Sequence, residues 1–174
     1  MSLRIKKAEI LLANLQSRLP FRYGIAVMKG LPHCVVRVHL QDEGQDAIGI
    51  AADNLAPKWF TKNPETLFAQ DADEMLKVIG QACLIAEKVS GGNVFELWRG
   101  IHEQHQKWAE KESIPPLLAG FGFSLVERAL LDAFLRSREI TLAAALRQNI
   151  FQLELGYFHE ILRGKSPAEF LPDQ

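Results

Sequence analysis

Apolar residues recur at helical spacing through most of the second half of the chain, and most densely between positions 118 and 136. From Phe123 onward, four of them share one stripe of a helix: Val126, Leu130, Ala133 and Phe134. Four more widen that stripe: Leu125, Ala129, Leu131 and Leu135. A helix this apolar is buried on most of its sides. We therefore predict that residues 123–136 form the helix against which the rest of the domain packs.

Three stretches in the first third of the chain are apolar and partly alternate with polar residues, as strands do. They cover residues 5–15, 33–40 and 47–52. A polar turn at 41–46 makes the last two an antiparallel hairpin, and the first stretch can join them. The predicted fold class is α+β, with a three-stranded antiparallel sheet followed by a helical bundle.

Two segments beside these strands are predicted to be irregular. The first covers residues 18–33, is bounded by two prolines and two glycines, and carries Phe21, Arg22, Tyr23 and Met28. The second covers residues 53–62 and holds two aromatic residues and two lysines. Loops this long inside a compact domain are usually functional or mobile. For the first segment two interpretations stay open: a cover for a ligand, or a surface loop that packs its apolar residues into its own domain.

Further helices follow from periodicity and capping residues. Asn63-Pro64 has the form of a helix start, and residues 72–89 have helical spacing up to the stop at Ser90-Gly-Gly92. Asn93 is predicted to cap a helix that reaches about Glu112. A short helix is expected to begin at Thr141, and another lies within residues 153–162.

Composition and charge narrow the function classes. The chain has 174 residues, of which 48% are hydrophobic and 24% charged, as in ordinary globular domains. A formal net charge of −1 provides no field that attracts nucleic acid or an anionic membrane. No apolar run approaches the roughly 20 residues that cross a bilayer, and the N-terminus lacks an apolar signal core. We expect a cytoplasmic protein without nucleic-acid or membrane partners, whose Cys34 and Cys83 are buried free thiols.

Candidate catalytic residues are scarce. His102-Glu103-Gln104-His105 invites a zinc interpretation, but the two histidines are three positions apart instead of four, and no further ligand is evident. A solvated helix face explains them better, and a small metalloenzyme remains the third hypothesis. Glu127 and Asp132 fall on different faces of their helix, so they do not form a catalytic pair. We predict no catalytic residue and no metal site in this chain.

Five motifs, taken in order, resemble a known family. They are Leu19-Pro-Phe-Arg-Tyr-Gly24, His33-Cys-Val-Val-Arg-Val38, Gly49-Ile-Ala-Ala52, Pro57-Lys-Trp-Phe-Thr-Lys62 and Ser124-Leu-Val-Glu-Arg-Ala-Leu-Leu-Asp-Ala-Phe134. Their order resembles the N-terminal capping domain of the enolase superfamily, in particular the mandelate racemase and muconate lactonizing enzyme branch. The last motif contains that family's Ala-x-x-Asp pattern, here at Ala129 and Asp132.

The resemblance implies a division of labour between this chain and a (β/α)7β barrel. The family's barrel holds magnesium and the bases that remove a proton α to a carboxylate. Residues 1–137 would be the capping domain, and residues 138–174 a helical extension and linker toward the barrel. The barrel would lie in the same or another chain, and nothing here matches its catalytic residues. We therefore expect this chain to be inactive alone, as part of an isomerase or lyase that acts on a small carboxylate, with a homo-oligomer as one possible assembly.

The resemblance also implies roles for the two irregular segments, which would cover the barrel mouth. Residues 20–28 would be the first cover and residues 53–60 the second. Arg22 and Lys58 would meet a carboxylate or phosphate of the substrate. The pocket walls would comprise Tyr23, Met28, Trp59 and Phe60. The alternative is a standalone binding or interaction module that uses the same surface to hold a partner.

Overall fold

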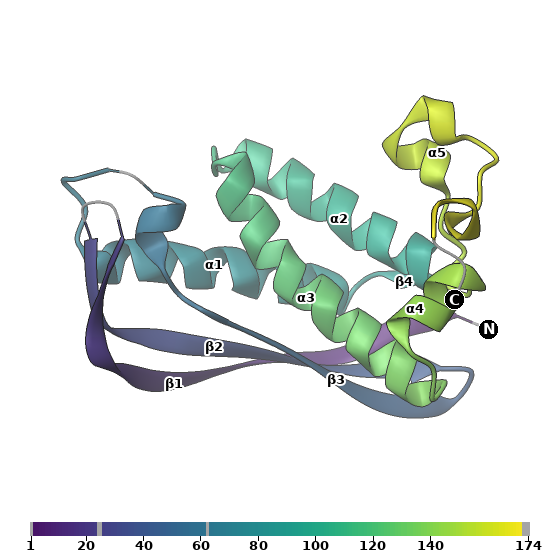
Figure 1. Ribbon diagram of the computed structural model, residues 1–174, viewed down its shortest axis with the longest axis horizontal. Helices are drawn as coiled ribbons and strands as arrows, with labels where there is room; N and C mark the ends of the chain where they lie inside the picture. Colours follow the sequence, from purple (N-terminus) through teal and green to yellow (C-terminus); the bar gives the residue numbers. More distant parts are fainter. Residues whose placement is uncertain (1, 24–25, 62, 172–174) are drawn as a thin grey trace.

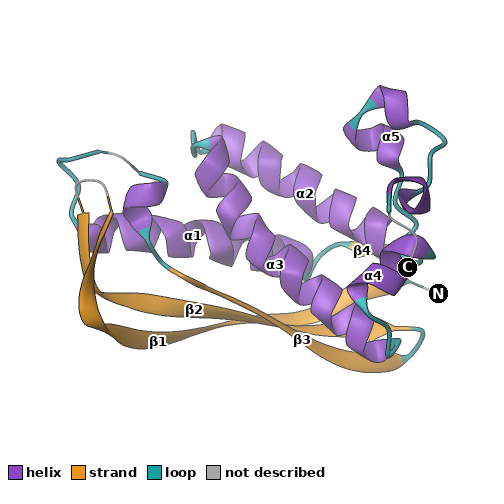
Figure 2. Cartoon of the chain, viewed as in Figure 1, coloured by secondary structure: helices purple, strands orange, loops and turns teal. Residues whose placement is uncertain are grey.

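The computed structural model describes residues 2–23, 26–61 and 63–171, apart from the side chains at positions 23, 26 and 28. One twisted antiparallel sheet forms one layer, and three long helices cover one of its faces (Figures 1 and 2). The helices are α1 (Phe68–Ala86), α2 (Val94–Lys111) and α3 (Pro116–Ser137). The core lies between the two layers.

The sheet contains four strands in the part of the chain that the structure describes. In chain order they are β1 (Leu3–Tyr23), β2 (Ala26–Asp42), β3 (Gln45–Asn54) and β4 (Ser90–Gly91). Their spatial order is β3-β2-β1-β4, and each neighbouring pair is antiparallel. The prediction of three strands is corrected by β4, which pairs with Leu3 and Arg4. Two residues are too few to show an alternating pattern, so the sequence revealed only the helix stop at this position.

Strands β1 and β2 extend through most of the segment that was predicted to be a loop. Phe21 lies opposite Met28, and Gln16 lies opposite Gly30. That prediction is wrong for residues 18–23 and 26–33, while residues 24–25 lie outside the described part. The pairing shifts register between Gln16 and Phe21, and Pro20, which has no N–H to donate, falls in this irregular stretch. Prolines and glycines therefore interrupt the ladder locally without ending the strands.

Helix α3 is the buried helix that the apolar pattern predicted. Leu125, Val126 and Ala129 are fully buried, and α3 packs on β2, β3, α1 and α2. The helix begins at Pro116 instead of Phe123. Proline is favoured at the first helical position because that N–H has no helical acceptor. Pro115 and Pro116 therefore mark the start of this helix.

Strand β3 approaches the backbone of α3 very closely. A Cβ atom on Gly49 would lie 2.1 Å from the carbonyl oxygen of Ala129 and 2.3 Å from the amide nitrogen of Ala133. Next to this contact, Asp132 Oδ2 accepts a hydrogen bond of 2.9 Å from the backbone N–H of Ile50. The Ala-x-x-Asp pattern therefore joins the central helix to the edge strand, and Figure 1 shows α3 crossing over β3.

The remaining helices match their predicted capping to different degrees. Asn93 caps α2 as predicted, because its Oδ1 accepts from the N–H of Glu96 at 2.8 Å. Helix α1 begins at Phe68, and Asn63 instead accepts from the N–H of Glu65 in a turn, so the helix start at Asn63-Pro64 is corrected. Thr141 precedes α4 (Leu142–Arg147), and the short α5 (Leu155–Phe158) follows. Within the described ranges, no helix is long and apolar enough to cross a membrane.

Candidate functional site

A hollow of about 320 Å³ opens where the end of the β1–β2 hairpin meets the segment after β3. Its walls are mostly apolar and come from β1, β2, the end of β3, the segment after it and the first half of α3. The lining residues are Phe21, Leu31, Asp53, Asn54, Ala56, Trp59, Phe60 and Phe121. The two segments that the sequence analysis singled out as covers therefore meet at one cavity. We take this hollow as the candidate functional site.

On the hairpin side, Phe21 of β1 lines the hollow. Arg22, the next residue along β1, is exposed and has its Cα opposite that of Val27, but it is not among the lining residues. The backbones of Tyr23 and Met28 belong to β1 and β2, so both lie on the same hairpin end. Their side chains lie outside the description, so their predicted contact with a substrate stays a prediction.

The second side of the site is a short 3-10 helix, η1 (Pro57–Trp59), together with Phe60. Trp59 is 58% exposed, whereas the ring of Phe60 packs 4.7 Å from that of Phe121. Leu55 is fully buried, and its N–H donates to the carbonyl of Pro32 at 2.9 Å, which anchors the segment to β2. The site thus contains one exposed ring, that of Trp59, and one ring that packs against the core, that of Phe60.

The ammonium group of Lys58 is bound within its own segment and is not free to contact a ligand in this hollow. Its Nζ lies 2.6 Å from Oδ2 of the buried Asp71, as an ion pair whose angles fall short of a hydrogen bond. It also donates to the carbonyl of Asn63 at 2.8 Å and to that of Thr66 at 3.2 Å. The two cations that were predicted to meet a substrate therefore differ in accessibility: Arg22 is exposed, whereas the ammonium group of Lys58 is bound by groups of its own segment.

The polar rim of the hollow is organised by two contacts of β3, one with α3 and one with β2. Asp53 Oδ2 accepts from Arg128 Nη2 at 3.1 Å, and Asn54 Oδ1 lies 2.8 Å from His33 Nδ1. Nothing in the sequence marked Asn54 or Phe121 individually as a site residue. Phe121 was missed because the helix was expected to begin at Phe123, although its position two residues earlier continues the same helix.

The two histidines of α2 lie among core side chains and do not line the hollow. His105 is fully buried, with Nε2 3.3 Å from the carbonyl oxygen of Val78. His102 stacks on Trp98 with ring centroids 4.9 Å apart. Burial lowers the pKa of both imidazoles. The prediction of a solvated helix face is wrong for His105, because tertiary packing covers it.

Neither metal chemistry nor thiol chemistry finds support in the described residues. Across residues 2–23, 26–61 and 63–171, no three His, Cys, Asp or Glu residues are placed to hold a metal ion. The magnesium that the resemblance implies would be held by the barrel, so no step through a metal is assigned to these residues. Cys34 and Cys83 are buried free thiols, as predicted. Burial raises the pKa of Cys34 to about 11 and that of Cys83 to about 12, so both stay protonated at neutral pH.

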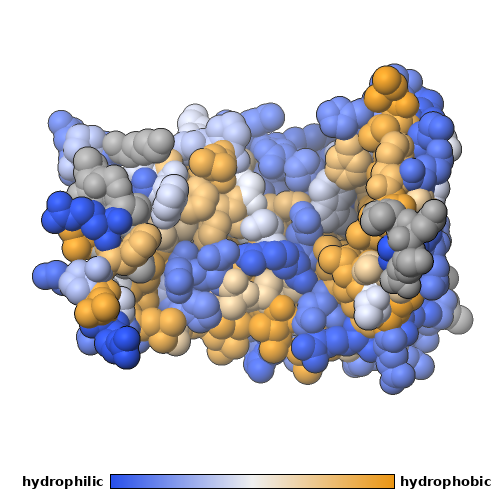
Figure 3. All heavy atoms as spheres, in the orientation of Figure 1, coloured by the Kyte–Doolittle hydropathy of each residue, from blue (hydrophilic) through white to orange (hydrophobic). Residues whose placement is uncertain are grey.

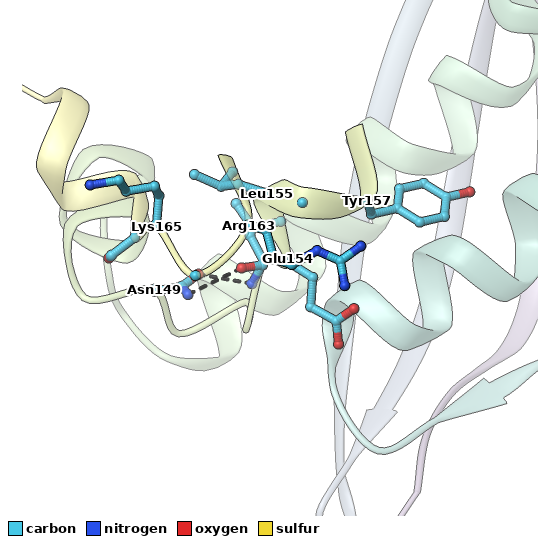
Figure 4. A pocket seen from close by; sticks show the side chains of 10 residues that line it. Asn149, Glu154, Leu155, Tyr157, Arg163 and Lys165 are labelled. Carbon is cyan, nitrogen blue, oxygen red and sulfur yellow. Dashed lines mark hydrogen bonds between the residues drawn. The ribbon is translucent and has the colours of Figure 1, made fainter. Parts of the chain in front are cut away.

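A second hollow, of about 610 Å³, lies within the C-terminal segment. It is lined by residues from 149 to 166, and Figure 4 shows Lys165 and Tyr157 pointing in opposite directions from it. The hydrogen bonds drawn in Figure 4 join the side chain of Asn149 to the backbone of Leu153, and they stabilise a turn within this segment. Because its polar groups do not converge on one point, this hollow is a weaker candidate for a binding site.

An antiparallel sheet with one face covered by three helices is an α+β fold of the enolase N-terminal type. No family model and no curated protein matches the sequence. Solved structures do match, and the resemblance inferred from the motifs is confirmed at the level of the fold.

Three of these structures illustrate the match. An enolase from the alpha proteobacterium BAL199 with bound magnesium is 16% identical, with a TM-score of 0.57, over 83% of this chain and 34% of that one. A mandelate racemase/muconate lactonizing protein from Herpetosiphon aurantiacus is 19% identical, with a TM-score of 0.57, over 82% and 34%. An enolase from Bradyrhizobium with magnesium and mandelic acid is 12% identical, with a TM-score of 0.52, over 84% and 35%. The chain thus spans about a third of the length of these structures.

Proposed function

We propose that this chain is the substrate-capping region of an enolase-superfamily enzyme. Its hairpin end and residues 53–60 would cover a substrate that is held by a (β/α)7β barrel in the same or another chain. The observation that carries the proposal is the hollow at which these two segments meet. The fold match, which spans only a third of the solved chains, supports it.

In this proposal the cap binds and shields the substrate, while the barrel performs the chemistry. The barrel's magnesium would stabilise the charge that develops when a proton α to a carboxylate is removed. Arg22 is the cation we assign to the substrate carboxylate, because a guanidinium can bind both oxygens. The similar enolase from Bradyrhizobium holds mandelic acid, which is a small carboxylate of this kind. Trp59 and Phe60 would wall the pocket and exclude water, together with Tyr23 and Met28.

The C-terminal segment supplies a second argument for a large neighbour. Tyr157, Phe158, Ile161 and Phe170 are exposed, and Ile161 is 87% exposed. Figure 3 shows apolar side chains gathered at the right-hand edge of the molecule, where this segment lies. Exposed apolar groups of this kind mark surfaces that another protein surface covers. We propose that residues 138–174 are the extension that leads toward the barrel.

The same surface also favours the alternative of an interaction module that holds a partner without catalysis. Both possibilities are tested by recovering the natural protein with an antibody against this chain and measuring its intact mass. A mass more than twice 19.6 kDa, or a fixed complex with a barrel-containing chain, supports the capping role. A mass near 19.6 kDa with a fixed partner that lacks a barrel contradicts the capping role and supports the interaction module.

A further inference from the structure

The ammonium group of Lys58 occupies the centre of a small ring of oxygen atoms. Nζ lies 2.8 Å from the carbonyl oxygen of Asn63, 3.2 Å from that of Thr66, 3.3 Å from Thr66 Oγ1 and 2.6 Å from Asp71 Oδ2. The side chain of Lys58 is 18% exposed and that of Asp71 is 2% exposed. A charge that is removed from water in this way is stable only with such partners.

These oxygens join two elements that are separate in the chain. Lys58 belongs to η1, whereas Asp71 lies in the first turn of α1. The turn between them is curled so that its oxygens point inward: Thr66 Oγ1 donates to the carbonyl of Asn63 at 3.0 Å, and the N–H of Glu65 donates to Asn63 Oδ1. The ammonium therefore acts as an internal cation around which this turn folds.

The residues that follow Lys58 directly are the two aromatic walls of the hollow. Trp59 and Phe60 both line it, and the N–H of Phe60 donates to the carbonyl of Pro57 at 2.8 Å. Because η1 is only three residues long, holding the end of the Lys58 side chain restrains the backbone that carries Trp59 and Phe60. A substrate carboxylate that reached Lys58 would also have to displace the carboxylate of Asp71.

We propose that Lys58 is a positioning residue for the candidate site: its ammonium, held by Asp71 and the oxygens of residues 63–66, sets Trp59 and Phe60 in the hollow. The claim that this placement of Trp59 and Phe60 matters for a substrate rests on the proposed function. The internal cation itself is a property of this chain alone. The negative group of the substrate would then be recognised from the hairpin side of the hollow, and not by Lys58.

The test uses the 174-residue chain labelled with 5-fluorotryptophan, because a chain with only three tryptophans has a simple fluorine NMR spectrum. Trp59→Phe assigns the signal of Trp59. In K58M/D71M, which removes both charges and leaves no unpaired buried carboxylate, we expect the Trp59 signal to shift by more than its linewidth or to broaden. The signals of Trp98 and Trp108 should stay in place. Lys6→Met, which breaks the exposed pair of Lys6 with Asp46 at 2.9 Å, is the matched control and should move none of the three.

Two results would overturn the proposal. One is a Trp59 signal in folded K58M/D71M that coincides with that of the unchanged protein, because the pair would then contribute only stability. The other comes from hydrogen exchange in the unchanged protein. We expect the amides of Phe60 and Thr61 to exchange with deuterium more slowly than those in the turn at residues 43–44. Equally fast exchange would show that the segment is not held. Neither measurement involves a barrel or a substrate, so failure here is distinct from failure of the capping role.

Discussion

Gly49 shows how one residue determines the contact between the sheet and the central helix. The space for its side chain is occupied by backbone atoms of α3, which cannot rotate away as a side-chain end would. Glycine is needed here for close approach and not for an unusual backbone conformation. The small residues Ala129 and Ala133 face it, so the contact depends on three small residues together.

We predict that Gly49→Ala lowers the free energy of unfolding by about 3 kcal/mol, at the upper end of the overpacking range. Gly120→Ala is the control, because nothing lies within 4 Å of its added Cβ and alanine favours a helix. Urea unfolding followed by circular dichroism measures both. Equal stability of the Gly49→Ala variant and the unchanged protein would contradict the close approach.

His105 makes stability depend on pH. Burial lowers its pKa in the folded protein below the ordinary value of 6.5, so the unfolded chain binds the proton more tightly. Stability is therefore complete above pH 6.5 and falls as the pH decreases from there toward the folded pKa. His102 contributes in the same direction.

The measurement is urea unfolding at pH 7.5 and pH 5.5. We expect the unchanged protein to be less stable at pH 5.5, and His105→Gln, which retains a donor for the Val78 carbonyl, to lose a large part of this difference. His33→Gln is the control, because that imidazole is not buried in the core. A pH dependence that survives in the double variant of His102 and His105 would assign it to other groups.

Arg22 is the residue on which the substrate proposal depends most. In a barrel-containing enzyme, Arg22→Ala should reduce kcat/KM by about 10- to 100-fold, as expected for losing a charge-assisted hydrogen bond of roughly 1.5–3 kcal/mol. The free energy of unfolding should change little, because Arg22 is exposed. Arg18→Ala, at an exposed position on the same strand, is the control. Unchanged kinetics for Arg22→Ala would remove Arg22 from the site.

At the scale of elements, the contact of α3 with β3 explains why the Ala-x-x-Asp pattern matters. β3 is an edge strand, and the N–H of Ile50 would otherwise face solvent without a ladder partner. Asp132 accepts this hydrogen bond and also pairs with Arg136 at 3.0 Å. A single carboxylate thus fastens the edge strand to the helix that carries the core.

Asp132→Ala should cost about 1–2 kcal/mol of unfolding free energy, since it leaves the Ile50 N–H without its acceptor. Faster deuterium exchange at the amide of Ile50 should accompany the loss. Asp46→Ala, which breaks only an exposed ion pair, should change stability by less than about 0.5 kcal/mol. The idea fails if both variants lose equal stability.

At the scale of the whole molecule, the exposed apolar residues of the C-terminal segment set the expected behaviour of the isolated chain. We predict that the chain self-associates or binds a hydrophobic dye such as anilinonaphthalene sulfonate. Ile161→Lys should lower dye fluorescence, whereas Leu117→Lys, at an exposed leucine at the start of α3, should lower it less. Light scattering and dye titration measure the two effects. A monomer without dye binding would count against a covered surface.

The sequence by itself determined the features that local periodicity encodes. The stripe around Val126 predicted the buried helix, and alternation predicted the central parts of β1, β2 and β3. Asn93 predicted the start of α2, because a capping side chain and the N–H that donates to it are three residues apart. The order of the motifs predicted the fold that the solved structures confirm. Each of these signals is contained in a short stretch of chain.

Only the tertiary structure decided features that depend on partners distant in the chain. β4 exists because Ser90 and Gly91 meet Leu3 and Arg4, and the hairpin continues past Pro20 because β2 pairs with it beyond the irregularity. His105 is buried because α1 and α3 cover it, and α2 alone does not show this. Lys58 and Arg22 differ for the same reason. The sequence predicted both as cations that meet a substrate, and only the folded structure places Asp71 against Lys58.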